Sequence, residues 1–129
     1  MIVNNRRNLE LRLIRLRNLI TQLDTLLLSC LDLTKNQTFA NGIQEVTEKI
    51  LETRRLVVAE ISPVKETLAI PIHCVKRETD ELNRLKQLAR EIGMQVSAAE
   101  IESFFVEIFN EAKLIQTATA LEGQPRLTK

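Results

Sequence analysis

Aromatic residues are scarce in this sequence, which has four Phe and neither Trp nor Tyr among its 129 residues. That scarcity argues against the nucleic-acid-binding modules that stack bases on aromatic side chains. A formal net charge of only +1 leaves no overall basic field to attract nucleic acid or a membrane surface. Apolar runs such as LDTLLL are too short to cross a bilayer. We therefore expect neither a nucleic-acid partner nor a membrane partner.

Cysteine and histidine are also rare, and Cys30, Cys74 and His73 are the full set. They are too few for a zinc site, so no metal is expected. Isolated cysteines are typical of reduced thiols in a cytosolic protein, and no signal-peptide pattern opens the chain. The composition therefore favours a cytoplasmic protein.

Glycine and proline number only three each, which leaves little material for turns. The abundant residues are Leu, Ile, Glu, Lys, Arg and Gln, which favour helix, and no strand pattern or internal repeat is present. A hydrophobic content of 44% suits one modest core, so residues 1–129 are expected to form a single domain. Apolar periodicity predicts four helices, over residues 5–33, 42–69, 74–92 and from Ser97 onward. The expected fold is an all-α helical bundle of about four helices.

The predicted helix ends carry recognisable local signals. These are the turn formers of TKNQTFANG (34–42), Gly93 as a C-terminal cap, and the capping box of Ser97 and Glu100. Pro63 lies within the second helical pattern and should bend that helix near Ala59, because proline lacks a backbone donor. Residues 42–121 then form the core of the domain, and EGQPRLTK (122–129) is expected to be a frayed tail.

Several polar residues occupy the apolar stripes of these helices. Arg54 lies four residues after Ile50 and four before Val58, and Lys65 lies four after Ile61. Eleven residues, or three turns, separate Arg54 from Lys65, so both point to the apolar side, ~16 Å apart along the axis. Each could reach water from the edge of the stripe. Two such cations could also hold a small anion between them.

Three further residues extend this set. Gln116 continues the stripe of the fourth helix, Glu78 lies one turn before Leu82 in the third, and Arg77 borders the same face. Taken one at a time, each of these side chains is expected to be exposed to solvent. Together, three cations, one amide and a single carboxylate describe a pocket for an anionic ligand, because buried cations without partners cost several kcal/mol each. No nucleophile–base pair accompanies them, so any chemistry is expected to act through electrostatics and positioning.

The segment RRLVVAEISPVKETLAIPIHCVKRE resembles the signature of the all-helical (type II) chorismate mutases. That signature has an Arg, a Lys eleven residues on, a Pro-hydrophobic turn, and Arg-Glu twelve residues after the Lys. The matching positions are Arg54, Lys65, Pro71-Ile72, Arg77 and Glu78. FFVEIFNEAKLIQ resembles the last family helix, with Gln116 at its functional glutamine. The resemblance covers residues 50–120.

The resemblance implies the Claisen rearrangement of chorismate, a small dianion, to prephenate, without a covalent intermediate and without a cofactor. Arg54 would pair a substrate carboxylate. Lys65 and Gln116 would donate to the ether oxygen. Arg77 would form part of the cationic wall, and Glu78 would accept a hydrogen bond from the ring hydroxyl.

The first helix departs from the family pattern. LRNLITQLDTLLL resembles the start of the long first family helix, and Arg17 matches its leading substrate-binding Arg. That Arg enters the site of the partner in the family's homodimer and lies seventeen residues before the Arg matched by Arg54. Here the separation is thirty-seven residues. Residues 34–42 could fold the helix back, which would place Arg17 and Arg54 at similar heights, ~24 and ~18 Å from the turn, in a monomer. Alternatively, residues 1–33 are an extra packing helix and Arg17 is a surface charge.

Two local departures bear on the activity. Cys74 stands where the family usually has Asp, and Pro63 lies two residues before Lys65. Two alternatives to a mutase therefore stay open, namely an isochorismate-pyruvate lyase of the same fold and a non-catalytic helical binding module.

Overall fold

The computed structural model describes residues 2–36 and 40–123 and forms four helices. They are α1 (Ile2–Leu33), α2 (Ala40–Thr67), α3 (Val75–Ile92) and α4 (Ala98–Gly123). The described part of the chain contains no strand, which confirms the all-α prediction. The predicted tail was wrong at residues 122 and 123, which complete α4, and the rest of it (124–129) lies outside the described residues. Within the same described ranges, no helix is long and apolar enough to cross a membrane.

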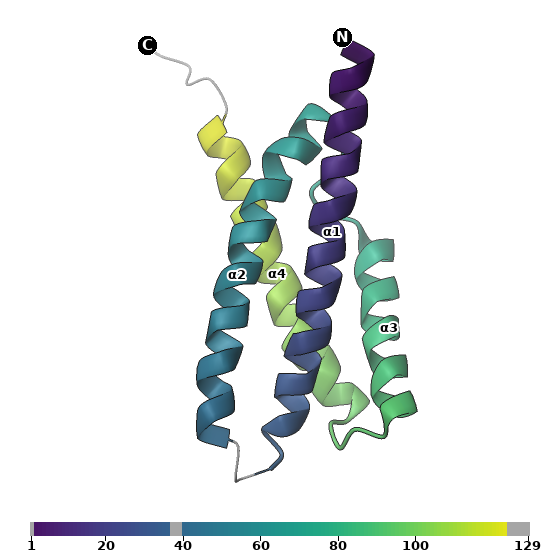
Figure 1. Ribbon diagram of the computed structural model, residues 1–129, viewed down its shortest axis with the longest axis vertical. Coiled ribbons are helices and arrows are strands. Elements are labelled where there is room, and N and C mark those ends of the chain that lie inside the picture. The colour runs from purple at the N-terminus through teal and green to yellow at the C-terminus, as the bar shows by residue number, and fades with distance from the viewer. Residues whose placement is uncertain (1, 37–39, 124–129) are drawn as a thin grey trace.

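The helices form an elongated bundle in which α1 and α2 run antiparallel as a hairpin (Figure 1). α4 crosses behind this hairpin, and α3 packs beside the half of α1 that lies nearer its C-terminus (Figure 1). Pro63 lies inside α2, which continues to Thr67, and the last turns of α2 lean toward α1 (Figure 1). The chain between α1 and α2 therefore folds the first helix back onto the second.

The apolar core has two parts, one toward each end of the bundle. The larger part surrounds Phe105, which is fully buried and meets Phe104 edge-on with ring centroids 5.1 Å apart. The smaller part joins α1 to the end of α2 through five residues: Leu13, Leu16, Ile61, Val64 and Leu68. Buried polar side chains, among them Asp24 and Arg54, lie along the helices between the two parts.

The predicted caps are confirmed at both ends of the α3–α4 connection. Gly93 adopts a left-handed φ of 79°, and its N–H donates to the carbonyl groups of Ala89 and Arg90. Ser97 and Glu100 exchange the two hydrogen bonds of a capping box, at 3.0 and 3.1 Å. These caps set where α3 ends and α4 begins, and so fix which residues of each helix reach the middle of the bundle.

Candidate active site

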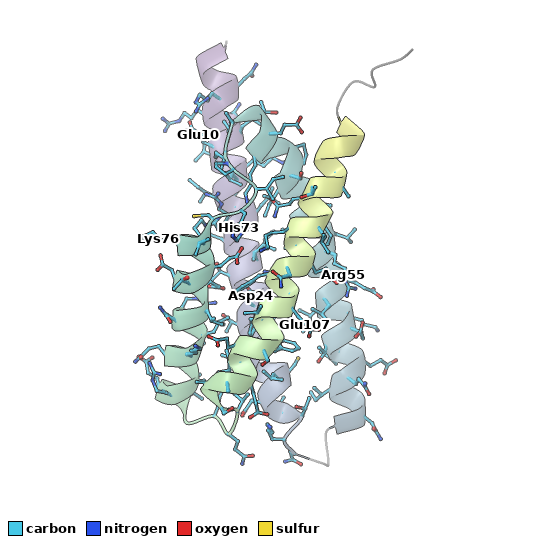
Figure 2. The ribbon with its side chains drawn as sticks, turned by 180° about the vertical axis from the view of Figure 1, so that it is seen from behind. Glu10, Asp24, Arg55, His73, Lys76 and Glu107 are labelled. Atoms are coloured by element: carbon cyan, nitrogen blue, oxygen red, sulfur yellow. The ribbon has the colours of Figure 1, made fainter. Side chains whose placement is uncertain are left out.

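A cavity of about 380 Å³ lies between the two parts of the core and is lined by all four helices. All six residues predicted from the sequence line this one cavity: Arg17, Arg54, Lys65, Arg77, Glu78 and Gln116. Figure 2 shows the bundle from behind, with Asp24 on α1 between α3 and α4 and His73 near the start of α3. The structure therefore brings together residues that are up to 99 positions apart in the sequence, from 17 to 116.

Arg54 is almost fully buried on α2 and has an ion-pair partner inside the cavity. Its Nε donates to Asp24 Oδ1 at 2.7 Å, and Nη2 lies 3.5 Å from Asp24 Oδ2. The guanidinium also lies over the ring of Phe109, 5.9 Å from its centroid. Asp24 itself is fully buried.

The sequence analysis was therefore wrong to treat Glu78 as the single carboxylate of this set. Asp24, Asp80 and Glu81 also line the cavity. One signal in the sequence could have identified Asp24, which interrupts the apolar stripe of the first helix one residue after Leu23 and three before Leu27. Arg54 therefore has a carboxyl partner within the protein before any ligand binds.

Lys65 points into the cavity from the last turns of α2 despite the proline two residues before it. Its Nζ donates to the carbonyl oxygen of Ile72 at 3.1 Å, so the segment after α2 folds back over the amine. Burial and the nearby charges of Arg77 and Arg17 lower the pKa of Lys65 to about 8. The amine has three donors, so two remain for a ligand after the bond to Ile72.

Two residues that line this cavity each have a buried polar atom without a hydrogen-bond partner within the described residues, namely the donor Arg17 Nε and the acceptor Gln116 Oε1. Leaving a buried polar group unsatisfied costs ~1–3 kcal/mol. An anionic ligand could supply the acceptor that Arg17 Nε lacks, but not the donor that Gln116 Oε1 lacks. The backbone of Gln116 is held separately, because its carbonyl accepts a bond of 3.0 Å from the Ser62 hydroxyl. Burial and Arg77 also lower the pKa of Arg17.

Arg77 and Glu78 occupy the first turn of α3 at the mouth of the cavity. Arg77 is exposed, whereas Glu78 is partly buried and its Oε2 lies 2.7 Å from Nδ1 of His73. Cys74 is the N-terminal cap residue of α3 but makes no side-chain capping bond, and its thiol is free. The sequence did not predict the contact between His73 and Glu78, because no local pattern places these two side chains together.

The charges around the cavity leave it positive. Six cationic side chains and four carboxylates line it, an excess of two positive charges. No group of three His, Cys, Asp or Glu in the described ranges could hold a metal ion. The arrangement suits recognition of a compact dianion by charge and hydrogen bonding.

The fold and the site thus define an all-helical protein with an open cationic pocket in which Arg54, Lys65 and Gln116 are buried. Residues 43–117, more than half of the chain, match the family model described as chorismate mutase type II. The chain belongs to the chorismate mutase type II family. No individual curated protein and no solved structure gives a significant match. The matched range includes every predicted site residue except Arg17.

Proposed function

We propose that this protein is a chorismate mutase, an isomerase that rearranges chorismate to prephenate. The proposal is supported by one observation in a chain of this family: Arg54, Lys65 and Gln116 line the same cavity. The charged side chains around that cavity have a formal excess of two positive charges. A dianion neutralises that excess. In the rearrangement, the ether C–O bond breaks as a C–C bond forms within the same molecule, so no atom is gained or lost and no cofactor is needed.

Each side chain has a role that its position supports. The guanidinium groups of Arg17 and Arg54 pair with the two carboxylates, while Arg77 extends the cationic wall at the mouth. Glu78 accepts a hydrogen bond from the ring hydroxyl. Lys65 and Gln116 donate to the ether oxygen, which gains negative charge as its bond breaks. The acceleration comes from holding the reactive conformer and from stabilising that charge with the buried donors Lys65 and Gln116.

We also propose that one chain completes the site. Arg17 lies on α1, which packs against α2 of the same chain, so its guanidinium reaches the cavity that contains Arg54 without a partner subunit. A monomer, or a dimer whose two sites are each built from one chain, would both retain this geometry. The homodimer of the family, in which the first helix enters the partner's site, is the alternative. We also propose that the protein is located in the cytoplasm.

Product identification tests the proposal. Purified protein is incubated with chorismate, and we expect loss of chorismate with formation of prephenate. Release of pyruvate from isochorismate would instead identify a lyase, and no turnover of either compound would identify a binding module.

A matched pair of variants tests the site. Gln116→Ala should lower kcat/KM by ~10²–10³-fold, as expected for the loss of one donor to a developing oxyanion. The fold should persist because Gln116 Oε1 has no partner within the described part of the protein. Gln87→Ala is the control, since Gln87 is exposed on α3 and, among the described residues, its hydrogen bonds are with Glu91 and Arg90 of its own helix. Equal activity of the two variants would contradict the assignment of Gln116.

A further inference from the structure

The buried carboxyl group of Asp24 lies in the pocket that we have assigned to a dianion, where a negative charge is unexpected. Asp24 is fully buried and points from α1 into the cavity, where it meets Arg54 at 2.7 Å. Its charge has the same sign as the ligand. A negative group in this place weakens ligand binding, unless it does something for the pocket that outweighs the repulsion.

The contact between Asp24 and Arg54 involves only one edge of the guanidinium. Asp24 accepts from Nε at 2.7 Å and lies 3.5 Å from Nη2, which leaves Nη1 without a contact to this carboxylate. A guanidinium is a rigid planar fork of five N–H donors, so fixing one edge fixes the direction of the other. The ring of Phe109, 5.9 Å from the guanidinium carbon, supports the same orientation from α4.

The groups facing Asp24 come from each element packed around it. α2 contributes Arg54, and α3 contributes Glu81, which pairs with Arg84 at 2.7 Å. α4 contributes Phe109 and Lys113 to the same cavity, and Arg17 lies two turns earlier on α1. Burial and the nearby Glu81 outweigh the attraction of Arg54 and raise the pKa of Asp24 to about 7. The carboxyl group therefore changes charge near neutral pH.

We propose that Asp24 is a positioning residue of this pocket: its carboxyl group fixes the edge of Arg54 that faces the ligand, and its negative charge lowers the affinity of the pocket for a dianion. When Asp24 is protonated, Arg54 keeps its orientation through the bond from Nε, and its full charge acts on the ligand. When Asp24 is ionised, part of that charge is neutralised. The inference rests on the proposed function for the identity of the ligand, but not on turnover.

The test compares wild-type protein with Asp24→Asn, whose Oδ1 can still accept from Arg54 Nε while the charge is gone. Binding of prephenate is measured by calorimetry from about pH 6 to about pH 8.5, because it is a dianion throughout this range. The ratio of the wild-type Kd to the Asp24→Asn Kd should be near one at the acid end and rise to ~10 at the alkaline end. Lys65 titrates in both proteins, so its effect cancels in the ratio.

Two further variants separate positioning from a structural role. Glu81→Gln removes the like charge beside Asp24, so the rise in the Kd of this variant, relative to Asp24→Asn, should move to lower pH. Asp24→Ala also lacks the charge but removes the acceptor, so it should bind prephenate more weakly than Asp24→Asn at every pH. A ratio of wild-type Kd to Asp24→Asn Kd that stays flat over the whole pH range would overturn the inference. An unchanged midpoint of the pH-dependent rise in the Kd of Glu81→Gln would also overturn it.

The failure of the inference is distinguishable from the failure of the proposed function. If wild-type protein neither binds prephenate nor converts chorismate, both fail. If it converts chorismate but the Kd ratio is flat, the inference alone fails.

Discussion

At the scale of single residues, the site depends on charges placed where water is largely excluded. Lys65 is buried at the cavity wall beside Arg17 and Arg77, and these surroundings lower its pKa to about 8. The ammonium form is needed to donate to the ether oxygen. Because this pKa is close to neutral pH, a modest rise in pH removes the charge of Lys65. The pH dependence of the rate therefore tests its role.

We predict that kcat/KM falls as pH rises through about 8, because Lys65 then loses its proton. In the Asp24→Asn background, where Asp24 does not titrate, Lys65→Arg should be slower, since its geometry differs, but it should lack this alkaline fall because guanidinium stays charged. Unfolding would not explain the loss in wild-type protein. The folded pKa of Lys65 lies below the ordinary 10.5, so its contribution to the free energy of unfolding rises with pH across that interval. A pH–rate profile, with unfolding measured in parallel, tests the prediction, and an alkaline fall that survives when Lys65→Arg is combined with Asp24→Asn would contradict it.

Most of the candidate residues could be identified from sequence, because polar side chains on apolar helical stripes stand out. Arg54, Lys65 and Gln116 were placed by periodicity, and the cavity contains all three. Asp24 also interrupts an apolar stripe, but its pairing with Arg54 could not be predicted, because that partner lies thirty residues away on the next helix. Such a pair becomes visible only when the packing angle and register of the two helices are known. The contact between His73 and Glu78 was missed for the same reason, since it depends on the path of the segment before α3.

At the scale of helices, the positions of the four elements followed from apolar spacing and from caps at Gly93 and Ser97. The ends without such signals were less predictable. α2 was expected to reach residue 69 but ends at Thr67, with Ala69 in the left-handed region at φ 58°. Ile70 N–H then donates to the carbonyl of Lys65 at 2.8 Å, the closing bond of a Schellman-type end. The sequence has no glycine at this position to indicate that the helix ends there.

Ala69 offers a test of that helix end, because an L-residue in the left-handed region is strained by ~1–2 kcal/mol. Ala69→Gly should relieve the strain and raise the free energy of unfolding by ~0.5–1 kcal/mol, after the greater chain entropy of glycine is counted. Ala59→Gly, in the interior of the same helix, is the control and should destabilise by ~1 kcal/mol. Urea denaturation measures both. Destabilisation by Ala69→Gly would show that the end of α2 is held differently.

At the scale of the whole molecule, sequence left two arrangements of the first helix open. Helical rise put Arg17 and Arg54 at similar heights if the chain turned back between residues 34 and 42, and the structure has α1 packed on α2 in this way. The choice depended on packing of one helix against another, which local sequence does not encode. The hairpin brings Arg17 and Asp24 of α1 into the cavity that α2, α3 and α4 complete.

The central claim is that one chain builds a complete cationic pocket that converts chorismate to prephenate. The most direct test is the rate of prephenate formation per chain, measured as the protein is diluted over several orders of magnitude, with sedimentation recording the oligomeric state at each concentration. We predict a constant rate per chain throughout, including where the protein is monomeric. A rate per chain that falls as a dimer dissociates would show that the site needs a partner, and no prephenate at any concentration would contradict the proposed chemistry itself.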